Sequence, residues 1–139
     1  MDGLFQIGDF CFRLICRDGI TPPANFMRFA ADGGTPEYTH TLEACESIAL
    51  AVEKPAVVRP DMLLYRNGSL ETRCIGVKGR PEYYGCYREE SENSARIAVA
   101  PHKTRMELDP VFVSLLALER RMIDRGGLIL HCAYLEHRG

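Results

Sequence analysis

The C-terminal end of the chain holds the residues whose types could do chemistry. His131 lies inside an apolar run next to Cys132, and His137 follows six positions after His131. On a regular strand the two histidines share a face but lie roughly 20 Å apart, too far to bind one metal ion together. Cys132 points to the other face, so no metal site is predicted. A core histidine with a backbone partner is the commoner explanation of His131, and a polar group at the edge of a ligand pocket is the alternative.

Two glutamates join His131 as candidate pocket-edge residues. Glu119 lies near the middle of the apolar face of a predicted helix, where a buried charge needs a partner. That partner is either an arginine from the β-rich part of the chain or His131, although a carboxylate that extends into solvent is the commoner arrangement. Glu136 follows the apolar run. The sequence contains no phosphate-binding loop, nucleophile elbow or zinc-protease motif, so these residues form no complete catalytic set.

Other polar residues are interpreted without a chemical role. Arg120 and Arg121 fall on the polar face of the same helix and are expected to be solvated charges. The tyrosines of residues 83–87 are expected to pack within a strand with hydrogen-bonded hydroxyls, rather than to stack on a ligand.

The helix that positions Glu119 has clear start and stop signals. Asp109 can cap the first free amides, Pro110 suits the first helical position, and Gly126 and Gly127 can take a left-handed C-terminal turn. We therefore predict one amphipathic helix over residues 109–125. Residues 128–135 are apolar on both alternating faces, which is typical of a strand covered on both sides. A turn follows and ends at Gly139.

The region before the helix predicts a meander of six or seven short strands. Asn67 and Gly68 form the strongest hairpin signal and predict a two-residue turn between strands at residues 62–66 and 69–77. Residues 38–53 carry both a strand and a helix pattern and stay undecided. The further predicted strands cover residues 10–17, 26–30, 83–88 and 95–100. The predicted fold is α+β and mainly β: an antiparallel meander of short strands, one amphipathic helix and a buried apolar strand.

Composition narrows the choice of partners and compartment. The 139 residues include 17 basic and 19 acidic ones, a formal charge of −2, so neither nucleic acid nor a membrane surface is expected to attract the chain. No apolar run is long enough to cross a bilayer, and a cytoplasmic location is the expectation. The six cysteines form no CxxC pair and mostly lie in apolar runs, which favours reduced, buried thiols.

The last ten residues also match a pattern found in known kinases. Leu130 and His131 match the first two residues of an Ile-His-Gly step, residues 133–135 match an apolar run, Glu136 matches a glutamate and Gly139 a turning glycine. Cys132 stands where the classical enzymes have glycine. In this the segment resembles the first strand and turn of the catalytic domain of HPr kinase/phosphorylase and its relatives of the phosphoenolpyruvate carboxykinase type.

The resemblance implies that the chain is the N-terminal part of a kinase. Residues 1–106 would then be a β-rich N-terminal module, and residues 107–139 the helix and first strand of an incomplete kinase-like domain. The phosphate-binding loop would begin within about ten to fifteen residues after Gly139. The complete protein would bind ATP and Mg²⁺ and transfer phosphate to a serine or another hydroxyl of a small protein or peptide. The chain alone would hold no cofactor and be inactive.

A second hypothesis about the function of the chain places it in a different class of protein. The chain would be a small β-rich binding or interaction module in which the apolar strand of residues 128–135 pairs with a second copy. Such a homodimer would complete its sheet across the interface.

Overall fold

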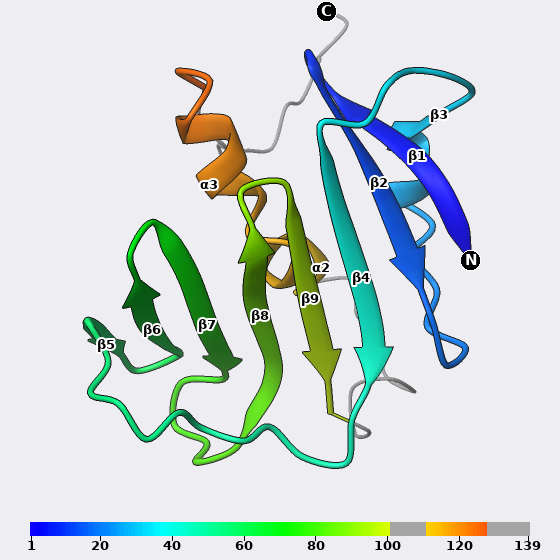
Figure 1. The fold of residues 1–139 in the computed structure, drawn as a ribbon. Helices are drawn as coiled ribbons and strands as arrows, with labels where there is room; N and C mark the ends of the chain where they lie inside the picture. Colours follow the sequence, from blue (N-terminus) through cyan, green and yellow to red (C-terminus); the bar gives the residue numbers. More distant parts are fainter. Residues whose placement is uncertain (101–110, 128–139) are drawn as a thin grey trace, which may run out of the picture.

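The computed structural model describes residues 1–100 and 111–127, which form one mixed sheet with short helices on one of its faces (Figure 1). The strand order is β3-β1-β2-β4-β9-β8-β7-β6-β5. The strands are β1 (Asp2–Ile7), β2 (Phe10–Cys16), β3 (Ala30–Ala31), β4 (Tyr38–Ala44), β5 (Val57–Arg59), β6 (Met62–Asn67), β7 (Leu70–Gly76), β8 (Tyr83–Ser91) and β9 (Ser94–Val99). The helices are the 3₁₀ helix η1 (Phe26–Phe29), α2 (Phe112–Leu115) and α3 (Leu118–Ile123). The predicted α+β, mainly β fold is confirmed.

The sequence predicts an antiparallel meander, but the sheet contains both parallel and antiparallel strand pairs. β2 pairs with β4, and β4 with β9, in parallel, whereas all other neighbours are antiparallel. Short turns join the antiparallel neighbours from β5 to β9, and β1 to β2. The parallel strands are separated by long connections, residues 17–37 and the whole β5–β8 segment. A long connection can return the chain to the end of the sheet from which it left, and a hairpin cannot.

The secondary structure of three segments differs from the prediction or decides between predicted alternatives. The predicted strand at residues 26–30 is the 3₁₀ helix η1 followed by the two-residue strand β3. The undecided segment forms β4, and no helix follows it among residues 45–56. β1 was missed because Phe5 is its single buried residue, which leaves little alternation to detect.

The hairpin at Asn67 and Gly68 has a two-residue turn, one position later than its sequence suggested. Asn67 pairs with Leu70 as the last rung of β6 and β7, so Gly68 and Ser69 are the central residues. Gly68 has a φ of 61°, and it occupies the first central position, where a type II′ turn places glycine.

The predicted helix is divided in two at Ala117, which has left-handed dihedral angles of φ 48° and ψ 40°. Four consecutive residues, Leu115 to Leu118, are no more than 1% exposed. Consecutive residues of one α-helix are 100° apart, so four of them cannot all face one core. The break at Ala117 allows all four side chains to be buried. The predicted stop is present: Gly126 has a φ of 72°, and the amides of Gly126 and Gly127 bond to the carbonyls of Ile123 and Met122.

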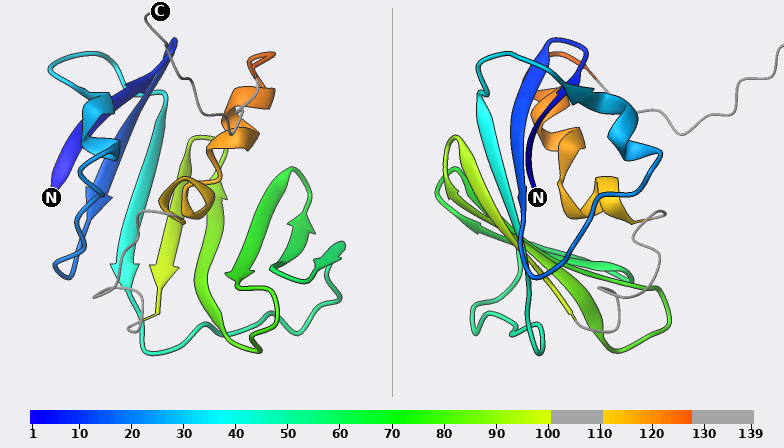
Figure 2. Two further views of the ribbon diagram at one scale, coloured as in Figure 1. Left: turned by 180° about the vertical axis from the view of Figure 1, so that it is seen from behind. Right: turned by 90° about the vertical axis from the view of Figure 1, so that its right-hand side faces the viewer.

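The main hydrophobic core lies between the sheet and the helices. η1, α2 and α3 cover the same face of the sheet (Figure 2), and the rings of Phe26 and Phe112 meet with centroids 4.7 Å apart. Residues of α2 and α3 belong to the same buried cluster as Phe12, Leu14 and Ile97 of the sheet. Within residues 1–100 and 111–127 no helix has the length and apolar character that crossing a bilayer requires.

Candidate functional site

Two glutamates are buried on the face of the sheet that the helices cover. Glu71 of β7 and Glu89 of β8 lie on adjacent strands, and the side chains are 5% and 2% exposed. The amide of Glu71 donates to Oε2 of Glu89 over 2.8 Å. A buried carboxylate is costly unless cations and hydrogen bonds compensate it. The two glutamates therefore require partners, and α3 supplies several of them.

Glu89 accepts hydrogen bonds on both of its oxygens. Arg120 donates from Nε to Oε1 over 2.6 Å and from Nη2 to Oε2 over 3.0 Å, a two-point contact. Arg121 donates to Oε1 over 2.7 Å, and the hydroxyl of Tyr87 to the same oxygen over 3.1 Å. Both arginines belong to α3, so Glu89 of β8 binds the helix to the sheet at two residues.

Glu71 extends the contacts along β7. Its Oε2 accepts from Nη2 of Arg73 over 3.0 Å, and its Oε1 lies 3.1 Å from Nη1 of Arg120. Arg73 also pairs with Glu119, the candidate pocket-edge residue. At distances of 3.1 Å or less, three carboxylates thus meet three guanidinium groups; Arg66 lies farther from Glu71, at 3.5 Å, and Asp124 farther from Arg121, at 3.7 Å. We call these residues the Glu89 network: Glu71, Glu89, Glu119, Arg73, Arg120 and Arg121.

Glu119 has the partner from the β region that its position on the apolar face demanded, although its side chain remains 43% exposed. The expectation that Arg120 and Arg121 are solvated charges is wrong. Arg121 is buried, with its guanidinium 4.8 Å from the ring centroid of Tyr38, and the Arg120 side chain is 23% exposed. The break at Ala117 turns α3 relative to α2 and directs both arginines toward β8.

The Glu89 network is suited to holding α3 and not to proton transfer. Burial raises the pKa of Glu89, but the hydrogen bonds from Arg120 and the Glu71 amide and the charges of Arg120 and Arg121 outweigh it, so the pKa lies below its ordinary value. Glu89 is therefore ionised at neutral pH and cannot donate a proton there. Its oxygens are already occupied by donors, which excludes a role as a general base.

His40 of β4 is the buried histidine of the described chain. Nε2–H donates to the carbonyl of Leu116 over 3.0 Å, at the break between α2 and α3, while Nδ1 has no partner. Burial lowers the pKa of His40 to about 3, so the ring is neutral. His40 therefore satisfies a helix-end carbonyl and has the structural role that the sequence analysis assigned to His131.

The opposite face of the sheet carries a row of polar side chains on neighbouring strands. Tyr65, Thr72, Arg88 and Arg96 are successive partners across β6, β7, β8 and β9. Two arginines in direct cross-strand register repel each other. Arg96 is neutralised by Glu43 and Glu90, whereas Arg88 forms no ion pair with the described residues.

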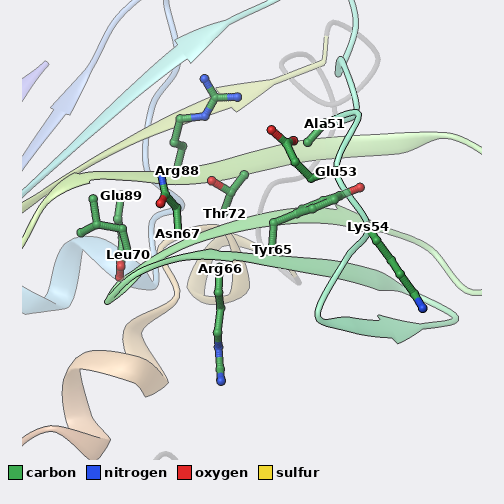
Figure 3. Close-up of a pocket in the computed structure, with 10 residues that line it drawn as sticks. All are labelled: Ala51, Glu53, Lys54, Tyr65, Arg66, Asn67, Leu70, Thr72, Arg88 and Glu89. Carbon is green, nitrogen blue, oxygen red and sulfur yellow. The ribbon is translucent and has the colours of Figure 1, made fainter.

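Arg88 contributes to an open pocket of about 480 Å³ between this row and the segment that follows β4. Figure 3 shows Tyr65, Thr72 and Arg88 on the same side of the sheet as Glu53, while Arg66 points to the other side. An arginine without an acidic partner, next to hydroxyl groups, can bind a carboxylate or a phosphate. The pocket is thus the candidate binding site of the described residues.

The remaining predicted site residues cannot be compared with this geometry. His131, Glu136, Asp109, Pro110 and Gly139 lie outside the described residues. Among the residues that are described, no group of three or more histidine, cysteine or acidic side chains could hold a metal ion.

Sequence reasoning missed Glu71 and Glu89. Their signal was faint: Glu89 shares a face of β8 with the buried Tyr87, but Glu71 shares its face of β7 with Arg73 and does not stand out as a buried residue. Comparison with protein-family models, curated proteins and solved structures found no match to the chain.

Proposed function

We propose that this chain is the N-terminal part of an ATP-dependent protein or peptide serine kinase of the HPr kinase type. In this proposal the β-rich module, residues 1–106, is the scaffold that holds the start of the kinase-like domain, residues 107–139, in place. The observation that carries it is the attachment of α3, where Glu89 accepts hydrogen bonds from both Arg120 and Arg121. α3 directly precedes the segment that resembles the kinase family.

The attachment matters because phosphoryl transfer depends mainly on positioning and electrostatic stabilisation. A helix tied to a nine-stranded sheet by buried ion pairs cannot rotate without separating charges in a dry environment. Gly126 and Gly127 then end the helix in a defined turn. These contacts support a scaffold role.

The chemistry belongs to the part of the parent protein that would follow Gly139. ATP and Mg²⁺ would be bound there, and a small protein or peptide would accept the phosphate on a hydroxyl. The chain by itself would be inactive, because both carboxylate oxygens of Glu89 already accept hydrogen bonds from within the chain. A cytoplasmic location, where ATP and reduced thiols are available, completes the proposal.

The coding sequence beyond codon 139 tests this proposal. The expected result is an open frame that encodes a second apolar strand and Gly-Lys-Ser or Gly-Lys-Thr within about ten to fifteen codons. An immediate stop codon in the genomic sequence, or an extension without that motif, would contradict it.

A second candidate is a β-rich binding module that completes its sheet by homodimerisation. The observation that favours it is the edge strand β5, where Val57 and Val58 are 40% and 70% exposed. An apolar edge strand presents unpaired amides and carbonyls to another chain. Sheet extension across two copies would cover it.

Size-exclusion chromatography with light scattering distinguishes the two candidates. If β5 mediates a dimer, Val58→Lys gives a monomer, whereas Val52→Lys, at a fully exposed valine outside the strands, leaves the dimer intact. A wild-type chain that is monomeric at all concentrations rules out the second candidate.

A further inference from the structure

Two free cysteines lie directly opposite each other in the sheet. Cys74 of β7 and Cys86 of β8 are register partners, and their side chains belong to the same small buried cluster on one face of the sheet. Neither takes part in the Glu89 network, which occupies the other face. The described cysteines are all free thiols, so the pair is present in its reduced form.

The register satisfies the backbone requirement of a disulfide. Directly opposed residues of an antiparallel pair have Cα atoms about 4.5 or 5.5 Å apart, and disulfides span Cα separations of about 4.4–6.8 Å. The backbone positions of Cys74 and Cys86 are therefore compatible with a cross-strand disulfide.

The two thiols differ in access and in proton affinity. Cys86 faces a cavity of about 240 Å³ together with Arg88 and Ile48, while Cys74 is 1% exposed beneath Tyr65. The neighbouring Cys74 thiol lowers the pKa of Cys86 to about 7 against the effect of burial, and the charge of Arg88 lowers it further. The neighbouring Cys86 and burial raise the pKa of Cys74. Cys86 is therefore the accessible thiolate and Cys74 the thiol that keeps its proton.

We propose that Cys86 and Cys74 form a redox modification site, in which Cys86 reacts with a hydroperoxide and Cys74 resolves the product as a cross-strand disulfide. The Cys86 thiolate attacks one peroxide oxygen, the O–O bond breaks, and hydroxide leaves and takes up a proton as water. The sulfur of Cys74 then attacks the sulfenic acid of Cys86, the S–O bond breaks, and the departing hydroxide takes the Cys74 proton. Two thiols and one H₂O₂ give one disulfide and two waters.

Peroxide treatment of the full chain tests the proposal directly. The folded protein is treated with H₂O₂, remaining thiols are alkylated, and the intact mass and tryptic peptides are measured without reductant. The expected result is the loss of two hydrogen atoms and a cross-linked pair of peptides, residues 74–78 joined to residues 79–88. The rate should rise with pH around the pKa of Cys86, near 7.

Variants separate the two roles. Cys74→Ser should abolish the cross-link and leave Cys86 as a sulfenic acid that dimedone labels, whereas Cys86→Ser should abolish both signals. Cys11→Ser, at another buried cysteine, should leave the cross-link unchanged. Cys86 lies close enough to Cys45 for its charge to raise the pKa of Cys45, so a bond from Cys86 to Cys45 or to any other cysteine would overturn the proposal. So would peroxide-treated wild-type protein that retains both thiols or carries only overoxidised Cys86.

Discussion

Arg121 of α3 donates a hydrogen bond from Nη2 to Oε1 of Glu89 on β8 over 2.7 Å, with side chains that are 10% and 2% exposed. This contact and that of Arg120 join the last described helix to the centre of the sheet. Because both partners are buried, removing one charge leaves the other without compensation.

Glu89→Gln should lower the free energy of unfolding by about 3 kcal/mol or more, since the arginines of α3 would keep their charge in a buried site. Urea denaturation followed by circular dichroism measures it. The adjacent Glu90→Gln is the matched control. Glu90 is 45% exposed and pairs with Arg96 at the surface, so its replacement should lower the free energy of unfolding by no more than about 1 kcal/mol. Equal losses for the two variants would show that burial of Glu89 does not matter.

Glu119→Gln should lower the unfolding free energy by only about 1 kcal/mol. Glu119 is 43% exposed, and Arg73 keeps its contacts with Glu71 when the Glu119 charge is removed. The same urea titration measures the loss. A loss as large as that of Glu89→Gln would mean that Arg73 depends on Glu119 for its neutralisation.

Stability should fall as pH falls below the ordinary histidine pKa, because of His40. Its pKa is about 3 when folded, against 6.5 for an ordinary histidine, so the unfolded chain binds the extra proton between these values. The contribution of neutral His40 to the free energy of unfolding is complete above about pH 6.5 and falls by about 1.4 kcal/mol per pH unit on acidification. The stabilisation by ionised Glu89 is lost only at lower pH, because the pKa of Glu89 is lowered from 4.5.

Urea titrations between about pH 5 and pH 7.5 isolate this effect. His40→Gln keeps a donor for the carbonyl of Leu116 and should give a flatter pH profile than the wild type. Parallel profiles for the two proteins would show that the pKa of His40 is the same in the folded and unfolded states.

Gly85→Ala should destabilise the protein by about 1–3 kcal/mol through overpacking. A methyl group at Gly85 of β8 would overlap Cδ2 of Leu115, which is fully buried in α2. Leu115→Ala in the Gly85→Ala background should recover part of the loss, a non-additive effect visible in a double-mutant cycle. Gly33→Ala, at a glycine with open space and no positive φ, is the neutral control.

Local patterns predicted much of the sheet, because alternation and turn residues act over a few positions. Phe10 to Cys16 alternates and forms β2, and the glycines at 68 and 126 mark turns that are present. Parallel pairing of β4 with β2 and β9 was not predictable in this way, since it depends on where long connections return.

The Glu89 network escaped prediction for a similar reason. On one continuous helix Arg120 and Arg121 lie on the polar face, and only the break at Ala117 turns them toward β8. No glycine or proline marks that break in residues 115–118. The break follows from the burial of four consecutive apolar residues, which is a property of the tertiary structure.

The most direct test of the proposed function is phosphate transfer by the complete gene product. The parent protein, purified with Mg²⁺ and radiolabelled ATP, should transfer the label to a serine-containing protein or peptide substrate, while the chain of residues 1–139 under the same conditions should not. Glu89→Gln in the parent protein should reduce the rate without removing ATP binding, because it loosens the scaffold and leaves the nucleotide site intact. A complete gene product that neither binds ATP nor transfers phosphate would contradict the proposal.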